Sequence, residues 1–400
     1  MSWSVPEKLA FVVPRYGEEV LGGAETVVRQ MAEKLVEAGK PVEVLTTCAL
    51  DHHTWENSYA EGLEEIHGVP VRRFPTAHSS GKMHKSIGAR IGAGAPTTLM
   101  DQELWLNDGF RSPGLYHYLS EEHHGFHTII LSPYMFWTTY ACSQIAPSKN
   151  VLRPCLHDEP FAYLDIYQPQ FRDCRGIIFN SQPEMDLAQR IFDLPTSTEI
   201  IGEGIDIPAS ADPERFRKDT GITEPFVIYA GRREWGKNVE TLISYYTRYS
   251  RRNPNIKLVL LGKGEVSIPR EAAGRIIDLG YVDQQTKYDA FAAASATCQP
   301  SLWESFSRLL MDSWLAETPV LAYGGSEVTA YHVRRSRGGF LFQDQQGFET
   351  ALDLVLTHPR LSEQMGRAGR AYVLENYTWD KVIAHLIETI DKWAFERGRQ

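Results

Sequence analysis

Two carboxylates, Glu304 and Asp312, stand eight positions apart around an apolar run that ends Phe306-Ser307-Arg308-Leu309-Leu310-Met311-Asp312. The run predicts a helix beginning near Glu304, and eight residues are a little over two turns, so both acids should project from one face. The free N–H groups and the dipole of a helix N-terminus attract anions. This segment therefore predicts a site for a diphosphate-linked sugar, with one acid beside it and another two turns deeper.

A basic loop lies between a predicted strand and a predicted helix, with the sequence Gly231-Arg232-Arg233-Glu234-Trp235-Gly236-Lys237-Asn238. Arg232 can bind phosphate oxygens through its planar fork, and Lys237 can add a compact charge. Taken alone, such a loop is usually solvated surface, but its position favours binding of a diphosphate. The chain has no Asp-x-Asp motif, so we expect cations and N–H donors, rather than a metal ion, to stabilise a leaving diphosphate.

The first half of the chain offers two further segments. Gly22-Gly23-Ala24-Glu25 follows the first predicted strand and opens a helix, where glycines allow close backbone approach to phosphate or sugar. Glu25 can equally be a helix-capping residue. His157, with Asp158 after it, follows a predicted strand at the edge where α/β folds bind ligands. His157 can hydrogen-bond a sugar or, alternatively, cap the strand, and Asp158 is placed to orient the imidazole.

The segment Pro300-Ser301-Leu302-Trp303-Glu304-Ser305-Phe306, followed by Thr318-Pro319-Val320-Leu321-Ala322, resembles the retaining family 4 glycosyltransferases, which have the GT-B architecture. Their signature is a Glu-x7-Glu pair in the context Pro-Ser-x-x-Glu-x-Phe-Gly. Two positions depart from it, because Asp312 replaces the second glutamate and Ser307 replaces the glycine. The resemblance covers most of the chain; it is specific from Ala230 to Phe342 and looser before Asn150.

The resemblance implies roles for these residues. Glu304 would contact the hexose hydroxyls of the donor beside the anomeric carbon, Asp312 would accept from the ribose hydroxyls, and Arg232 and Lys237 would bind the diphosphate. With His157, the residues Glu304, Arg232 and Lys237 make up the predicted catalytic set, and no metal is implied. The other predicted donor-binding residues are Gly22, Gly23, Gly231, Gly262, Tyr281, Val282, Ser305, Phe306 and Ser307.

Apolar runs alternate with helical periodicity along the whole chain, a pattern typical of parallel sheets covered by helices. We expect an α/β GT-B protein with two Rossmann-like domains whose parallel sheets face a central cleft. Residues 1–205 would bind the acceptor, joined by a terminal helix over 379–400 that crosses back, and residues 206–378 would bind the nucleotide-sugar. Between residues 77 and 111 the pattern breaks, and we interpret this stretch as an irregular acceptor-facing loop or a mobile insertion.

The thirteen strands predicted from these runs are Leu9–Val13, Val42–Thr46, Val69–Phe74, Thr128–Leu131, Asn150–Leu156, Gly176–Phe179, Ser197–Ile201, Phe226–Ala230, Lys257–Leu261, Ile276–Gly280, Ala296–Gln299, Val320–Ala322 and Phe340–Phe342.

Composition bounds the function. The chain has 400 residues, of which 42% are hydrophobic and 23% charged, so two domains of ordinary globular type are expected. A net charge of -10 argues against nucleic acid as a partner. No signal-peptide pattern or membrane-length apolar run is visible, which predicts a cytoplasmic protein. Five scattered cysteines indicate buried thiols rather than a metal site.

One basic cluster permits peripheral contact with a membrane or a phosphorylated acceptor, although a solvated surface is the plainer interpretation; its members are Arg72, Arg73, Lys82, Lys85 and Arg90.

Together these features predict a metal-independent retaining glycosyltransferase that moves a hexose from a UDP- or GDP-sugar to a saccharide, glycolipid or small-metabolite hydroxyl. Two alternatives share the fold: a nucleotide-sugar 2-epimerase, and a degenerate nucleotide-sugar-binding subunit, which the changes at Asp312 and Ser307 motivate. An NAD-dependent dehydrogenase is disfavoured, because Gly22-Gly23-Ala24 lacks the Gly-x-Gly-x-x-Gly pattern.

Overall fold

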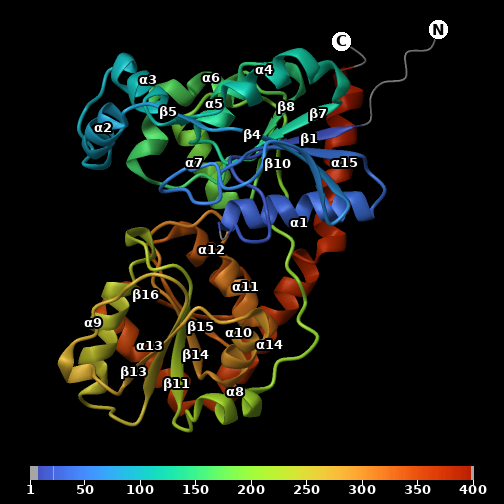
Figure 1. Ribbon diagram of the computed structural model, residues 1–400. Helices are drawn as coiled ribbons and strands as arrows, with labels where there is room; N and C mark the ends of the chain where they lie inside the picture. The colour runs from blue at the N-terminus through green and yellow to red at the C-terminus, as the bar shows by residue number, and fades with distance from the viewer. Residues whose placement is uncertain (1–7, 21, 398–400) are drawn as a thin grey trace. The chain divides into compact units, whose positions relative to one another are not determined.

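The computed structural model describes residues 8–20 and 22–397. The chain forms two compact units, one made of Met1–Gly204 with Asp380–Gln400 and the other of Ile205–Trp379. Each unit is a sheet with helices packed on it (Figure 1). The division lies one residue from each of the boundaries expected from the sequence. The C-terminal helix α15 (Trp379–Arg397) joins the first unit from Asp380 onward.

The first unit is built on an eight-stranded sheet, in which all neighbours are parallel except β3 and β4. A separate antiparallel pair joins β5 (Ala77–His78) to β6 (Phe110–Arg111). In spatial order the strands of the large sheet are β10 (Thr198–Ile200), β9 (Gly176–Phe179), β8 (Asn150–Leu152), β7 (Thr128–Leu131), β1 (Leu9–Val12), β2 (Val42–Thr47), β4 (Val69–Phe74) and β3 (Gly62–Ile66).

Helices and short 3-10 turns cover this sheet, and the apolar side chains of its central strands are fully buried. The terminal helix packs here: Trp393 is 5% exposed and lies where a Cβ on Gly176 would stand 2.6 Å from its ring. The α-helices besides α15 are α1 (Gly23–Glu37), α2 (Lys82–Gly92), α3 (Leu99–Asn107), α4 (Pro113–Glu122), α5 (Trp137–Ser143), α6 (Gln168–Arg172) and α7 (Gln182–Ile191), and the 3-10 turns are η1 (His123–Gly125), η2 (Pro147–Lys149), η3 (Pro160–Tyr163) and η4 (Asp165–Tyr167).

The second unit is a six-stranded parallel sheet with a core on each face. Alternation along β11 shows this, because Phe226 and Ile228 join one apolar cluster while Val227 and Tyr229 join the other. In spatial order the strands are β13 (Ile276–Gly280), β12 (Lys257–Leu261), β11 (Phe226–Ala230), β14 (Ala296–Gln299), β15 (Val320–Tyr323) and β16 (Gly339–Phe342).

The helices of the second unit divide between these two cores. Side chains from α8, α10, α11, α12 and α14 enter the cluster that contains Phe226, while α9 and α13 enter the cluster that contains Val227. Their bounds are α8 (Pro213–Thr220), α9 (Val239–Ser250), α10 (Gln284–Ala293), α11 (Arg308–Leu315), α12 (Glu327–Ser336), α13 (Gln345–Thr357) and α14 (Pro359–Asn376), with 3-10 turns at η5 (Trp235–Lys237) and η6 (Arg270–Ala272).

Two predicted segments of the first unit are wrong, and one of its strands was not predicted. Residues 77–111 are not an irregular loop, because they form β5, α2, α3 and β6. Strand β3, at the sheet edge, was not predicted; four of its five residues are exposed, so it carries no buried apolar pattern. The strand predicted to reach Leu156 ends at Leu152. Its continuation is interrupted because Pro154 lacks an N–H and Cys155 has a left-handed φ of 53°.

All five cysteines are free and buried, as the sequence predicts. Burial raises the pKa of the Cys155 thiol to about 11 and that of Cys174 to about 12. Within residues 8–20 and 22–397, no helix is both long and apolar enough to cross a membrane.

Candidate functional site

Glu304 does not stand at a helix N-terminus, contrary to the sequence prediction. Helix α11 begins only at Arg308, and Ser307 before it has a left-handed φ of 75°, which bends the chain out of helical geometry. Phe306 is buried in the core, and Leu302 donates its N–H to the Gly236 carbonyl at 2.9 Å. The segment is therefore a loop anchored against the basic loop, and the two acids do not share a helix face.

The structure brings Lys237 and Glu304 into direct contact. The Lys237 ammonium lies 2.7 Å from Glu304 Oε1, with 24% of the lysine side chain and 10% of the glutamate side chain exposed. Gln299, at the end of β14, also donates to Glu304 Oε1, at 3.2 Å. Partial burial strengthens such a pair relative to one in bulk water. The result is a carboxylate held in one place beside a cation that retains access to solvent.

Close backbone contacts and one buried charge hold the loop after β11. Arg233, with 2% of its side chain exposed, pairs with Asp278 and donates to the Gly264 carbonyl at 2.9 Å. Gly231 and Gly262 are close neighbours: a Cβ on Gly262, whose φ is +121°, would stand 2.0 Å from the Gly231 carbonyl oxygen. Tyr229 donates its hydroxyl to the Arg232 carbonyl at 2.6 Å. The Arg232 guanidinium pairs with Glu234 at 2.8 Å and keeps 43% of its side chain exposed. Gly231 and Gly262 thus shape the loop, and Arg232 remains accessible to an anion.

The aromatic part of this loop packs on the Glu304 segment. Trp235 and Trp303 have ring centroids 4.8 Å apart, and a Cβ on Gly236 would stand 2.7 Å from the Trp303 ring. Asn238 donates its side-chain amide to the Pro300 carbonyl at 3.1 Å. These contacts explain why two segments far apart in sequence place Lys237 and Glu304 together.

Asp312 is buried within the second unit. Its carboxylate accepts from Lys287 at 2.7 Å and from the Tyr288 hydroxyl at 2.8 Å. Burial raises the pKa of Asp312, but the charges of Lys287 and Arg308 and the two hydrogen bonds outweigh burial, so its pKa lies below the usual value. Asp312 is therefore ionised and held by its neighbours, and its link to the ribose stays a prediction.

Of the predicted donor-binding residues before α10, Tyr281 is exposed and Val282 is partly buried. Tyr281 is 63% exposed, and the Lys263 ammonium lies 5.3 Å from the centre of its ring. Val282 precedes Asp283, which caps α10 by accepting from the Thr286 N–H at 2.9 Å. Ser305 and Phe306, also predicted at the donor site, are buried. Of this group, Tyr281 offers the most open side chain to a ligand.

In the first unit, the Gly22-Gly23 pair opens α1 as predicted, and the two glycines differ. A Cβ on Gly22 would stand 1.9 Å from Glu25 Oε2, so a larger residue here would displace the Glu25 carboxylate. Glu25 is buried and pairs with the buried Arg15. Gly23 is exposed, and no heavy atom lies within 4 Å of its hypothetical Cβ. Packing therefore does not require a glycine at position 23, and a contact between Gly23 and a ligand stays a prediction.

His157 follows a buried segment and is partly exposed. Its Nδ1 lies 3.6 Å from Glu159 Oε1, so Glu159 rather than Asp158 is its acidic neighbour. Asp158 instead accepts from the Tyr163 hydroxyl at 2.8 Å. The segment is anchored by Glu184 on α7, whose Oε1 accepts from the Leu156 N–H at 2.6 Å. Burial raises the pKa of Glu184 to about 8, against the backbone hydrogen bonds that favour its charged form.

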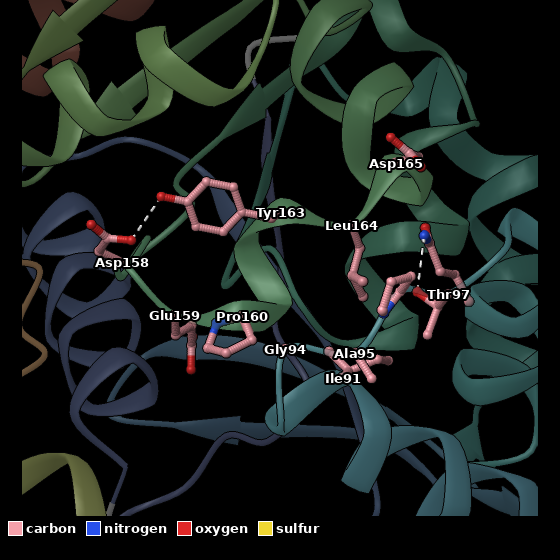
Figure 2. A pocket seen from close by; sticks show the side chains of 12 residues that line it. Ile91, Gly94, Ala95, Thr97, Asp158, Glu159, Pro160, Tyr163, Leu164 and Asp165 are labelled. Carbon is pink, nitrogen blue, oxygen red and sulfur yellow. Dashed lines mark hydrogen bonds between the residues drawn. The ribbon is translucent and has the colours of Figure 1, made fainter.

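The first unit has a cavity of about 540 Å³, and the residues that line it include Asp158, the residue that follows His157 in the sequence. Its walls come from the α2–α3 connection and from the segment 158–165, and Figure 2 shows the Tyr163 hydroxyl pointing toward Asp158. Gln102 joins the two walls, because its Oε1 accepts from the Ile166 N–H at 2.9 Å and its amide donates to Thr97 at 3.4 Å. The helices that replace the predicted loop thus form one side of a defined hollow.

Sequence reasoning missed Gln299, Lys287 and Tyr288, each of which contacts a predicted acid. Gln299 adjoins the Pro300-Ser301 signature, so its polar side chain at the end of an otherwise buried strand was an available signal. Lys287 and Tyr288 lie on α10, more than 20 positions before Asp312, and no sequence spacing indicates their contact. Within the described residues, no group of three or more His, Cys, Asp or Glu side chains could hold a metal ion.

The fold is that of the GT-B glycosyltransferases. Sucrose-phosphate synthase from Thermosynechococcus elongatus superposes with a TM-score of 0.72 at 16% identity, covering 96% of this chain and 98% of that one. HepE from Anabaena, solved in complex with UDP-glucose, gives a TM-score of 0.70 at 16% identity, covering 96% of this chain and 99% of that one.

Sequence comparison agrees with the fold. Residues 212–372, which lie in the second unit, match the family described as "Glycosyl transferases group 1". Among relatives, phosphatidyl-myo-inositol mannosyltransferase from Mycolicibacterium smegmatis is 27% identical, over 96% of this chain and 93% of its own length. A glycosyltransferase of uncharacterized specificity from Methanocaldococcus jannaschii is 22% identical, over 94% of this chain and 95% of its own length.

Proposed function

We propose that this group 1 glycosyltransferase is a retaining enzyme of the family 4 type, which transfers a hexose from a UDP- or GDP-sugar to a hydroxyl of a saccharide, glycolipid or small metabolite. The observation that carries the proposal is the Lys237–Glu304 pair, which stands on a strand–loop–helix framework within the matched residues. The relative named as a mannosyltransferase and the neighbour bound to UDP-glucose support a hexose donor.

The proposed chemistry uses cations already fixed in the second unit. Lys237 and Arg232 would neutralise the diphosphate as the sugar–phosphate bond breaks, without a metal ion. Glu304 would accept from hexose hydroxyls beside the anomeric carbon, and Asp312 would accept from the ribose. In the first unit, Gly23 and His157 would contact the sugar being transferred. Retention would follow if the acceptor hydroxyl attacks the sugar from the face that the diphosphate leaves. The departing diphosphate would assist that hydroxyl. The proposed location is the cytoplasm.

The test is a thermal melt with UDP-, GDP- and ADP-sugars, followed by turnover of the donor that stabilises the protein. A ligand present at 100 times its Kd adds about 2.7 kcal/mol of stability, which a melt detects. Glu304→Ala and Lys237→Ala should each lower turnover by about 100-fold or more while the melting temperature stays nearly unchanged. Near-wild-type turnover in both variants would contradict the proposed site, and activity that vanishes with a chelator and returns with manganese would contradict the metal-independent mechanism.

The same assay separates the alternatives. A nucleotide-sugar 2-epimerase would consume the donor without an acceptor and yield an epimeric sugar. A degenerate subunit would bind the donor with no turnover on any acceptor. The pairing of Lys237 with Glu304 favours the transferase over the degenerate subunit, because both predicted catalytic side chains are present and in contact.

We propose that the cavity beside His157 receives the acceptor. Its twelve described lining residues include Asp158, Glu159 and Asp165 and no lysine, arginine or histidine. Three carboxylates repel a phosphate group and favour a neutral or amine-bearing saccharide. Tyr163 adds a ring that is 56% exposed, suited to the apolar face of a sugar.

The basic cluster gives little support to a phosphorylated acceptor or an anionic membrane. Arg72 pairs with Glu43, Arg73 with Glu64, and Arg90 with Asp101. The remaining members, Lys82 and Lys85, are exposed on α2. Most of the positive charge expected from the sequence is therefore neutralised within the first unit.

The acceptor proposal is tested with matched acceptors, such as glucose and mannose against their 6-phosphates. The neutral sugar of each pair should be preferred, and Asp158→Asn with Asp165→Asn should reduce that preference by about tenfold. Glu121→Gln on α4 removes an exposed carboxylate outside the cavity and should leave the preference unchanged. Preference for the phosphorylated sugar would contradict an acceptor site with this lining.

A further inference from the structure

Gln299 is a buried amide at the carboxyl end of β14, with 2% of its surface exposed. Its Nε2 donates to the Ser307 hydroxyl at 2.7 Å and to Glu304 Oε1 at 3.2 Å. Its Oε1 accepts from the Ser301 hydroxyl at 2.8 Å and from the Ser301 N–H at 3.4 Å. One side chain therefore connects both ends of the loop that carries Glu304.

The orientation of this amide follows from its partners. A backbone N–H can only donate, so the Ser301 N–H requires an acceptor, and the Gln299 oxygen must face it. The NH₂ group then faces Glu304 and Ser307, where a carboxylate and a hydroxyl both accept. The opposite orientation would set the amide oxygen against the Glu304 carboxylate, which is repulsive. The network has one satisfied arrangement.

Ser307 occupies a backbone conformation that side chains rarely adopt. Its φ is 75° and its ψ is 74°, in the left-handed region where glycine is strongly favoured. Glycine would adopt this conformation without strain but would offer no hydroxyl to Gln299. The strained serine is thus accounted for by the hydrogen bond that its hydroxyl makes, which points to a local function.

Both protein donors to Glu304 converge on the same oxygen. Lys237 Nζ and Gln299 Nε2 both contact Oε1, and among the described residues no hydrogen bond to Oε2 is found. Lys237 is also the cation proposed to bind the diphosphate, so when the donor binds, its charge is shared between Glu304 and the diphosphate. Gln299 is not proposed to contact the donor, because its other hydrogen bonds go to Ser301 and Ser307. Gln299 can hold Glu304 while Lys237 serves the phosphate.

We propose that Gln299, fixed by Ser301 and Ser307, is a positioning residue that holds the Glu304 carboxylate by Oε1 and leaves Oε2 to accept from a hydroxyl of the donor sugar. The proposal rests on the transferase function proposed above and adds to it a residue outside the predicted site. Gln299 acts through Glu304 and touches no reacting atom. Its removal should weaken recognition of the sugar and leave recognition of the diphosphate intact.

The first test compares Gln299→Leu with Thr297→Val. Thr297 lies two residues earlier on β14, is fully buried and accepts from the Ser313 hydroxyl at 2.8 Å, so its variant removes a buried hydrogen bond without touching Glu304. Calorimetry measures binding of UDP or GDP and of the matching nucleotide-sugar, and nucleotide release with glucose or mannose as the acceptor measures turnover. Gln299→Leu should lower turnover and nucleotide-sugar affinity by about tenfold with unchanged nucleotide affinity. Thr297→Val should lower only the melting temperature.

The second test compares Ser307→Ala with Ser307→Gly. Both remove the hydroxyl, but only glycine relieves the left-handed strain, so Ser307→Gly should melt about 2 °C above Ser307→Ala. If the hydroxyl acts through Gln299, both variants lose turnover by a similar factor, several-fold, despite their different stabilities. Turnover that follows the melting temperature instead would assign Ser307 a structural role only and overturn the proposal.

The outcomes separate this inference from the proposed function. An active wild-type protein whose Gln299→Leu variant binds nucleotide-sugar and turns it over normally refutes the positioning role alone. Equal losses of nucleotide and nucleotide-sugar affinity also refute it, because they indicate general damage to the loop. A wild-type protein that binds no nucleotide-sugar refutes the proposed function and, with it, the role of Gln299.

Discussion

The carboxylate of Asp312 shows how a single buried side chain can contribute to the stability of the second unit. Lys287 and Tyr288 both donate to it, and its pKa lies below the usual value of an aspartate. A lowered pKa in the folded state contributes stability that is present above the unfolded pKa of about 3.9 and is lost as the pH falls through the folded value. The contacts of the ionised Asp312 with Lys287 and Tyr288 should therefore stabilise the second unit at neutral pH and cease to do so in acid.

Asp312→Asn should accordingly cost about 2 kcal/mol of unfolding free energy at pH 7, because it removes a charge that Lys287 faces. The deficit should shrink at pH 3, which lies below the unfolded pKa of about 3.9, because the unfolded chain then gains a proton that the folded carboxylate resists. Urea denaturation at the two pH values measures this difference. Asp219→Asn, an exposed acid of the same unit, is the control and should show no deficit at either pH. A deficit of equal size at pH 3 and pH 7 would show that the charge of Asp312 is not the source.

At this scale the sequence indicated which residue types were present and not what they contact. Arg232, Lys237, Glu304 and Asp312 were chosen because their charges suit a diphosphate and a sugar. Their partners come from elsewhere in the chain: Lys287 is 25 positions before Asp312, and Lys237 is 67 positions before Glu304. Such contacts depend on which strands become neighbours in the sheet, and the spacing of residues within one segment does not reveal this order.

Elements with strong apolar periodicity were predictable, and elements without it were not. Buried parallel strands such as Phe226–Ala230 and Lys257–Leu261 match the predicted residues, because burial on both faces leaves a continuous apolar run. Helix α3 has exposed Leu99, Met100 and Leu104 beside buried Trp105 and Leu106, so its pattern has no polar face to mark it as a helix. The start of α11 was misplaced because nothing local showed that Ser307 takes a left-handed conformation.

The start of α1 supports a prediction at the same scale. Gly23 is the first residue of the helix, and an added methyl group would meet open space. Alanine is the better helix former by up to about 1 kcal/mol, so Gly23→Ala should melt at or slightly above the wild-type temperature. If a substrate approaches the backbone here, the methyl group should still lower turnover by about tenfold or more.

A matched variant isolates that effect. Gly125 is exposed and has the same open space around its hypothetical Cβ, so Gly125→Ala should preserve both stability and turnover. Melting curves and donor turnover are measured for both variants. Full activity in Gly23→Ala would remove Gly23 from the substrate-binding residues.

At the scale of the whole molecule, the chain returns to its first unit after completing the second. Helix α15 supplies Trp393 to the first unit, against Gly176 on β9, although more than 200 residues separate the two positions. His385 lies 3.5 Å from Glu199, and Lys40 lies 3.4 Å from Asp391, which adds polar contacts along the same helix. The amphipathic pattern predicted this terminal helix, and its packing partners became visible only in the folded unit.

Trp393→Ala should therefore destabilise the first unit by about 3–5 kcal/mol, the usual cost of truncating a buried tryptophan. For a unit of this size the loss corresponds to a fall of roughly 10 °C in its calorimetric transition. Arg232 and Lys237, which are proposed to bind the diphosphate, lie in the second unit, so UDP or GDP should bind the variant with unchanged affinity. Lys392→Ala, an exposed neighbour on α15, controls for changes to the helix itself and should melt like the wild type. An unchanged melt in Trp393→Ala would show that α15 does not stabilise the first unit, and loss of UDP or GDP binding would show that nucleotide binding depends on more than the second unit.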